Sequence, residues 1–370
     1  MSNEPNPRAR MIALVGKKKV GKSTALGLDL STSLMVEDKG AVSTTVDTLL
    51  KMPVPRPSIG NENAAAFTQR MEAWDRNGVL DRYPGGVGVD DASVLFDDSV
   101  IEWGDTKAGQ SNDFHKYKEL DYWLKRLRRV FRDGSRNRPM VLCFHESGPT
   151  FVGGGVVKQG CPEVPSKKQQ GQIPALCDAV LFVVDWPESP DPVWKKGLYG
   201  AAGDTAWMSA DRWNVCTPGR PVIPFNLREY LRQTGWDPGR PKGLEWLEPL
   251  VDQLVEAFGQ APPAGRGKVA EAFIDWLTRR SVHPGLVYWI VRDAYARRWY
   301  VDNPVSALST LLAGIAGTLP VRPGGVPGTG GTAPPPPPPA GDPAPSPAGD
   351  PTSAPAAPPA ASTPAGKPGT

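Results

Sequence analysis

The stretch MIALVGKKKVGKST, residues 11–24, decides what kind of protein this chain encodes. A run of apolar residues leads into Gly16, and after four further residues come Gly21, Lys22 and Ser23. This is the spacing of the phosphate-binding loop G-x-x-x-x-G-K-[ST]. The apolar run predicts a buried strand, and the residues after the loop predict a helix. The motif therefore stands in the strand–loop–helix context in which it binds phosphate.

The motif has a physical basis in its glycines and its helix. Gly16 and Gly21 let the backbone turn so that successive N–H groups point at one anion. The helix N-terminus adds unpaired N–H groups and the positive end of its dipole. Lys22 is expected to contact the β- and γ-phosphates, and the Ser23 hydroxyl to complete the shell of a magnesium ion. We therefore expect ATP and Mg²⁺ as cofactors. The residues expected to contact the nucleotide are Gly16, Lys17, Lys18, Lys19, Val20, Gly21, Lys22, Ser23 and Thr24.

The amino-acid composition limits the classes of protein that fit this sequence. The 370 residues include 39% hydrophobic side chains, enough for a sizeable core, and the net charge of +3 gives no global signature of nucleic-acid binding. Any such binding must come from a local patch. The four cysteines are widely spaced, which favours reduced thiols over a zinc site or disulfides. The polar N-terminus indicates neither a signal peptide nor a membrane anchor, so we expect a cytoplasmic protein without membrane contact.

Two apolar runs end in acidic residues. Residues 33–36 predict a second strand that ends at Glu37 and Asp38. Residues 93–98, SVLFDD, predict a buried parallel strand that delivers Asp97 to the edge of the sheet, where it would hold magnesium through water opposite Ser23. Asp98 is the alternative, and an ordinary strand followed by a capping aspartate is the other interpretation.

Two further apolar runs predict strands at residues 139–144 and 179–185. The first ends at His145, which is placed either to sense a γ-phosphate or to serve as a structural histidine. Arg212 lies between two tryptophans. It is interpreted either as a stacked structural guanidinium or as a γ-phosphate contact across a subunit boundary.

Two segments carry basic residues that could contact a polyanion. Residues 148–172 show neither helical nor strand periodicity and contain Lys158, Lys167 and Lys168. They suit either contact with a polyanion or a plain flexible loop. Residues 113–132 predict an amphipathic helix with a basic face, which on a surface helix is usually only solvated.

The chain divides into four parts by composition. We expect a flexible N-terminus at residues 1–10, an α/β core at 11–235, and a helical appendage at 236–318. Residues 319–370 are rich in proline, alanine and glycine, and are expected to form a disordered tail that could dock on a protein partner.

The order of these motifs resembles RecA-type ATPase cores, and especially compact phage-encoded RecA-like proteins associated with single-strand annealing and recombination. The resemblance rests on GKKKVGKST, the acidic strand end at Glu37, the SVLFDDS and PMVLCFHES runs, and PSKKQQGQIPALCDAVLFVVD. It implies a mostly parallel sheet flanked by helices. It assigns Lys22 and Ser23 to phosphate and magnesium, Asp97 to the second magnesium contact, Glu37 to the attacking water, with Asp38 as its competitor, and His145 to the γ-phosphate. Residues 148–172 would contact DNA.

The hypothesis that follows is a magnesium-dependent ATPase that acts on single-stranded DNA in phage recombination or replication, in the host cytoplasm if it is phage-encoded. An arginine finger at Arg212 would require a homo-oligomer. The main alternative is a nucleotide-binding switch or scaffold in phage assembly with little ATPase activity. A small-molecule or nucleotide kinase ranks lower, because no lid-like cluster of arginines is evident.

Overall fold

The computed structural model describes residues 11–37, 47, 58–60, 63–111, 114–133, 139–152, 155–201 and 206–304. The predictions for Asp38, for residues 1–10 and for the tail at 319–370 lie outside these ranges. So do residues 305–318 of the expected helical appendage.

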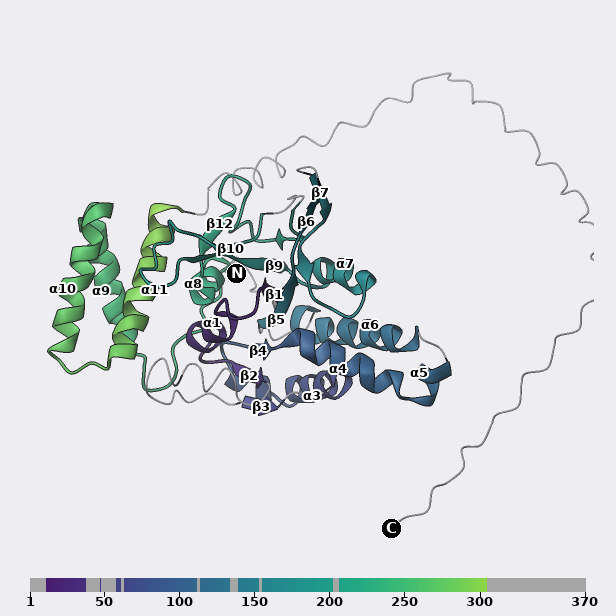
Figure 1. Ribbon diagram of the computed structural model, residues 1–370. Helices are drawn as coiled ribbons and strands as arrows, with labels where there is room; N and C mark the ends of the chain where they lie inside the picture. Colours follow the sequence, from purple (N-terminus) through teal and green to yellow (C-terminus); the bar gives the residue numbers. More distant parts are fainter. Residues whose placement is uncertain are drawn as a thin grey trace, which may run out of the picture. The chain divides into compact units, whose positions relative to one another are not determined.

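A ten-stranded mixed sheet forms the centre of the described chain (Figure 1). Its order is β12-β10-β9-β1-β5-β4-β2-β3, with β11 beside β9 and β8 beside β5. The strands from β9 to β3 are parallel, whereas β8, β10, β11 and β12 pair antiparallel with their neighbours. The sheet strands are β1 (Met11–Gly16), β2 (Leu34–Glu37), β3 (Ser58–Gly60), β4 (Val87–Asp90), β5 (Met140–Ser147), β8 (Cys161–Pro162), β9 (Ala179–Asp185), β10 (Lys196–Tyr199), β11 (Ala210–Asp211) and β12 (Val222–Pro224).

Helices cover both faces of this sheet, because the central strands are apolar on both sides. Alternate residues of β1 belong to two different core clusters: Ala13 packs with one and Leu14 with the other. The first cluster is covered by α3 (Ala64–Arg76), α4 (Ala92–Gly104), α6 (His115–Arg128) and α7 (Lys167–Leu176). The second is covered by α1 (Lys22–Asp29) and α8 (Leu227–Gln233).

Three C-terminal helices share a third core cluster that includes Phe258 and Trp289. They are α9 (Leu247–Gln260), α10 (Arg266–Thr278) and α11 (Pro284–Asp302). Tyr300 of α11 belongs to the second cluster, so α11 also packs on the sheet domain. The remaining elements are α5 (Lys107–Ser111), the β6–β7 hairpin (Thr150–Val152 and Gly155–Lys158) and the short turns Val79–Arg82, Arg129–Asp133 and Pro263–Gly265. No described helix has the length and apolar character needed to cross a bilayer.

The predicted fold class is confirmed: an α/β core with a mostly parallel sheet, flanking helices and further helices toward the C-terminus. The predicted strands at 139–144 and 179–185 correspond to β5 and β9. The boundaries of the four predicted parts remain predictions.

The strand predicted at residues 93–98 is wrong, because this segment belongs to helix α4. Asp91 caps the helix by accepting a hydrogen bond from the backbone N–H of Ser93 at 2.7 Å. The buried residues then follow helical spacing, i, i+3, i+4, i+7 and i+8. They are Ala92, Leu95, Phe96, Ser99 and Val100, and Ser93 beside them is buried as well. The strand that ends in an acid is instead β4, which precedes the helix.

The expectation of a structureless segment at 148–172 is also wrong. It contains the β6–β7 hairpin, β8 and the start of α7. Helix α7 begins after Ser166, whose hydroxyl accepts a hydrogen bond from the backbone N–H of Gln169 at 3.2 Å.

Candidate functional site

The loop between β1 and α1 has the backbone conformation that its glycines permit. Gly21, the N-cap of α1, has φ 98° and Lys19 has φ 63°, both in the left-handed region. A Cβ placed on Gly16 would lie 3.0 Å from Cγ2 of Val20 and 3.2 Å from Cβ of Val183. Gly21 therefore allows the left-handed backbone conformation at the start of α1, and Gly16 allows β9 to pack closely against the loop.

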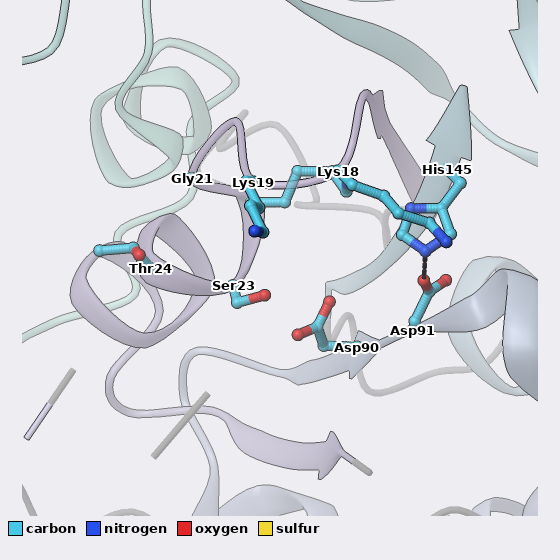
Figure 2. A pocket seen from close by; sticks show the side chains of 9 residues that line it. Lys18, Lys19, Gly21, Ser23, Thr24, Asp90, Asp91 and His145 are labelled. Carbon is cyan, nitrogen blue, oxygen red and sulfur yellow. Dashed lines mark ion pairs between the residues drawn. The ribbon is translucent and has the colours of Figure 1, made fainter. Parts of the chain in front are cut away.

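A pocket of about 430 Å³ opens above this loop (Figure 2). Its size lies within the usual range for small-molecule sites. The loop and α1 form one wall, and the ends of β4 and β5 form the other. The lining residues are Lys18, Lys19, Gly21, Lys22, Ser23, Thr24, Asp90, Asp91 and His145.

Lys22 is held inside the loop. Its residue is only 6% exposed, and its Nζ donates hydrogen bonds to the carbonyl oxygens of Gly16 at 2.8 Å and Lys17 at 2.9 Å. These bonds use two of the three N–H donors of the ammonium group. The positive charge is thus fixed at the floor of the pocket.

Asp90 occupies the position that was predicted for Asp97. It ends β4, and it lines the same pocket as Ser23. Burial raises the pKa of Asp90, while the nearby Ser23 hydroxyl and the charge of Lys22 oppose the rise. Asp97 lies on the exposed face of α4 and does not line the pocket, and Asp98 is exposed as well. The pairing of Asp97 with Ser23 therefore has no geometric basis, because it depended on the wrong strand.

Asp91 and His145 form an ordered pair on the pocket wall. Oδ2 of Asp91 lies 2.6 Å from Nε2 of His145 (Figure 2). The backbone N–H of His145 donates to Oγ of Ser93 at 3.0 Å, and that hydroxyl donates to the carbonyl oxygen of Glu163 at 2.7 Å. The predicted placement of His145 beside the phosphate loop is thus observed, and its role remains a prediction. Sequence reasoning missed Asp91, although the acidic pair after the short run VGV was the available signal.

Two glutamates lie near the pocket. Glu37 ends β2 directly opposite Asp90 in the strand register and is 1% exposed, but it does not line the pocket. Its assignment to the attacking water stays a prediction. Glu146 follows His145 on β5 and was missed by the sequence patterns. Burial raises the pKa of its carboxyl group, and the charges of Lys17 and Lys22 oppose this.

Other candidate residues lie apart from this pocket. Arg212 follows β11, which pairs with the first residues of β9, so it is at the edge of the sheet opposite the phosphate loop. Its Nη1 lies 3.2 Å from Oδ1 of Asp178, which agrees with a structural guanidinium. A contact across a subunit boundary remains a prediction.

The three lysines expected to contact DNA are exposed, and that role also remains a prediction. Nζ of Lys158 donates to the hydroxyl of Ser147 at 2.7 Å, and Lys168 pairs with Asp121 at 3.1 Å. Lys167 begins α7. None of the three lines the pocket.

Trp194 packs against the phosphate loop, and Arg292 of helix α11 packs on Trp194. A Cβ on Gly21 would lie 3.5 Å from Cζ2 of Trp194, so the indole lies against the loop. The ring of Trp194 stacks on Phe225 with centroids 5.4 Å apart, and Cζ of Arg292 lies 4.9 Å from its centroid. Arg292 in turn pairs with Asp29 at the end of α1. These contacts join residues that are far apart in the sequence, so no local sequence pattern predicts them.

Neither a protein-family model nor a curated protein sequence matches this chain. Among solved structures, it is similar to a prototypical ATPase from the type III secretion system of pathogenic bacteria. The two share 12% sequence identity with a TM-score of 0.32, over 79% of this chain and 81% of that one. A likeness at this level carries no argument about function, which therefore depends on the pocket itself.

Proposed function

We propose that this protein binds magnesium–ATP in the pocket above the phosphate loop and hydrolyses it. The observation that carries the proposal is that Ser23 and Asp90 line one pocket together with the phosphate-binding loop, beside the buried ammonium of Lys22. A phosphate-binding loop, a hydroxyl and a carboxylate that face one pocket are the groups with which P-loop proteins hold a magnesium–phosphate complex. No described group of three or more His, Cys, Asp or Glu forms a protein-only metal cage. This fits magnesium, which keeps several waters and takes few protein ligands.

In the proposed reaction, a water attacks the γ-phosphorus in line and ADP leaves. The loop N–H groups and Lys22 bind and orient the phosphates. Ser23 and Asp90 would hold the magnesium ion, which supplies charge neutralisation when bound. Asp91 is the carboxylate best placed to orient the water and accept its proton, because it lines the pocket. Glu37 remains the competing candidate, as the resemblance implies.

Substitution of Lys22 tests this proposal. Lys22→Ala is expected to abolish ATP turnover and to weaken nucleotide binding strongly, whereas the exposed Lys242→Ala should leave both unchanged. Phosphate release measured at saturating magnesium–ATP checks the expectation. Undiminished turnover by Lys22→Ala would show that this pocket is not the site. Comparison of Asp91→Asn with Glu37→Gln then identifies the carboxylate that acts on water.

A second candidate function is a nucleotide-binding switch or scaffold, as in phage assembly, with negligible turnover. The pair between Asp91 and His145 favours it, because a carboxylate engaged at 2.6 Å is less available to a water. This candidate predicts stoichiometric ATP binding without phosphate release, with or without single-stranded DNA. Turnover that DNA stimulates would exclude it.

We further propose single-stranded DNA as the polymer on which hydrolysis acts, in phage recombination or replication. Its support is the resemblance of the sequence motifs to RecA-like proteins, together with the exposed Lys158 at the end of β7 and Lys167 at the start of α7. ATP hydrolysis measured with and without a single-stranded oligonucleotide tests it. Equal rates and no measurable binding of the strand would contradict it.

A further inference from the structure

We propose that the exposed face of helix α6 binds single-stranded nucleic acid, an inference that rests on the polymer named in the proposed function. The surface is the α6 stripe: Lys118, Tyr122 and Lys125 of α6, and Arg129, which caps the C-terminal end of the helix. These positions follow the spacing i, i+4, i+7 and i+11, so their side chains leave the helix within a sector of about 60° at 100° per residue. All four residues are exposed.

The three basic residues of the stripe are not neutralised by acids among the described residues. Of the acidic groups nearby, Glu72 pairs with Arg126 and Asp121 with Lys168, while Glu119 lies 3.9 Å from His115 rather than against a lysine or arginine of the stripe. The stripe therefore presents three uncompensated positive charges. The helix dipole explains basic residues in the last turn of α6, but it does not explain Lys118 or an exposed tyrosine between the charges.

Tyr122 gives the stripe an aromatic surface of defined orientation. Its side chain lies beside Arg126, whose Cζ is 5.6 Å from the ring centroid, and its ring meets Trp123 edge to face at 5.2 Å. Arg126 is itself fixed by two hydrogen bonds to the carboxylate of Glu72 on α3. Tyr122 is nonetheless 51% exposed. Binding a flat ligand on this ring would cost little side-chain entropy.

Cations spaced along a helix with an aromatic ring between them match a single strand. The cations contact phosphates, and unstacked bases can lie on the ring. The bases of a duplex are stacked on one another and are not available to Tyr122. An anionic membrane would require several apolar anchors beside the basic residues, and the exposed Phe114, one turn before Lys118, is a single such residue on this line. From Lys118 to Arg129 the stripe spans about 16 Å at 1.5 Å per residue.

The charges on the helices beside α6 indicate the path that a bound nucleic-acid strand would follow. Helix α6 packs between α4 and α7 (Figure 1). The outer face of α4 carries Asp97 and Asp98, which would repel phosphates, whereas α7 begins with the exposed Lys167. A bound strand is therefore expected to follow α6 and to pass toward α7.

Fluorescence anisotropy with labelled 30-nucleotide oligothymidine, in DNA and RNA forms, tests the inference on the full chain. The stripe variant carries Lys118→Gln, Lys125→Gln and Arg129→Gln. A matched control carries Lys242→Gln, Lys268→Gln and Arg279→Gln, which are exposed on the C-terminal part. For three lost phosphate contacts, the slope of log K against log salt should fall by about 2, at about 0.7 per contact. The control should match the wild type.

Tyr122→Leu separates stacking from charge. It should weaken single-strand binding about tenfold, as expected for loss of one base stack, with an unchanged salt slope. Magnesium–ATP binding and hydrolysis without nucleic acid should be unchanged in all variants, because none of these residues lines the pocket. Thermal melts establish that each variant is folded. If the triple variant is not folded, the single variants Lys118→Gln and Tyr122→Leu test whether the α6 stripe binds the strand.

Several outcomes overturn the inference. Wild-type affinity and salt slope in the stripe variants would place the strand elsewhere, while the proposed DNA role would stand. Equal binding of duplex DNA, or binding of phosphatidylserine vesicles without oligonucleotide binding, would assign the stripe to another partner. If the wild type binds no oligonucleotide but still hydrolyses ATP, both this inference and the polymer fail and the ATPase proposal survives.

Discussion

Replacing Arg292 with methionine tests whether helix α11 holds α1, the helix that follows the phosphate-loop motif, in place. Arg292 and Asp29 are 1% and 0% exposed, and Nη2 of the arginine donates to Oδ2 of Asp29 at 3.0 Å and to the carbonyl oxygen of Phe225 at 2.8 Å. Nη1 forms a second bond to the same carboxylate. Methionine keeps much of the apolar volume, so the variant removes mainly the charge and its hydrogen bonds.

The expected cost follows from what remains behind. In Arg292→Met, the carboxylate of Asp29 stays buried with one donor, the backbone N–H of Leu227 at 2.7 Å, and the carbonyl of Phe225 loses its side-chain donor. Removing one partner of a buried pair costs about 3–5 kcal/mol. We therefore expect the free energy of unfolding to fall by that amount in urea titrations followed by circular dichroism. The exposed Arg279→Met, as a control, should change it by less than about 0.5 kcal/mol.

A double-mutant cycle separates the pair from its surroundings. Asp29→Asn combined with Arg292→Met should cost less than the sum of the single variants by about 1–3 kcal/mol, because the double variant no longer leaves the Asp29 charge buried without Arg292. Since Arg292 also lies over Trp194, which touches Gly21, Arg292→Met should weaken nucleotide binding under conditions where the protein remains folded. An additive cycle, or a loss below about 1 kcal/mol, would refute the reasoning about the pair. Unchanged nucleotide affinity would refute the connection to the loop.

Three further predictions test the site and the network. Asp90→Asn should remove the magnesium dependence of nucleotide binding, whereas Asp97→Asn should leave it intact. Titration of a fluorescent nucleotide with and without magnesium measures this dependence. The reverse result would return the magnesium contact to Asp97. Gly21→Ala should weaken nucleotide binding, because φ 98° costs an L-residue about 1–2 kcal/mol, and wild-type affinity would contradict the loop conformation. Burial alone would raise the pKa of Asp293, but the guanidinium groups of Arg240, Arg228 and Arg292 outweigh it and hold the pKa below its ordinary value. That carboxylate therefore contributes stability above about pH 4 that is lost as the pH falls through the lowered pKa, so Asp293→Asn should show a shallower acid loss in unfolding measurements.

The sequence predicted the phosphate loop because its signal is local. Glycine spacing directly determines a backbone conformation, and Gly21 has the positive φ that the motif requires. The strands β5 and β9 were predicted because uninterrupted apolar runs are typical of strands buried on both faces. The run at residues 93–96 was misread, since a short apolar run does not distinguish a strand from a buried helix. Only the wider window, with buried positions three and four apart, identifies α4.

That error carried over to the site. The strand that ends in the acid, β4, has only the short run VGV before Asp90, and Gly88 weakens its strand pattern. The glycine is required by packing, because a Cβ there would lie 2.9 Å from Sδ of Met35 on the neighbouring strand. The contact between Asp29 and Arg292 joins residues 263 positions apart, and no periodicity within either helix reports it.

The order of the strands explains why these side chains meet. Because β5 lies between β1 and β4, His145 stands in register with Gly16 at the start of the phosphate loop. Asp90 and Asp91 follow one strand further on, and Glu37 lies opposite Asp90 on β2. Parallel strands place their carboxyl ends at one edge, so the loop, the histidine and the acids form a row there. A γ-phosphate bound by Lys22 would therefore lie between the loop and the His145–Asp91 pair, and that pair is the part of the site that can distinguish hydrolysis from simple binding.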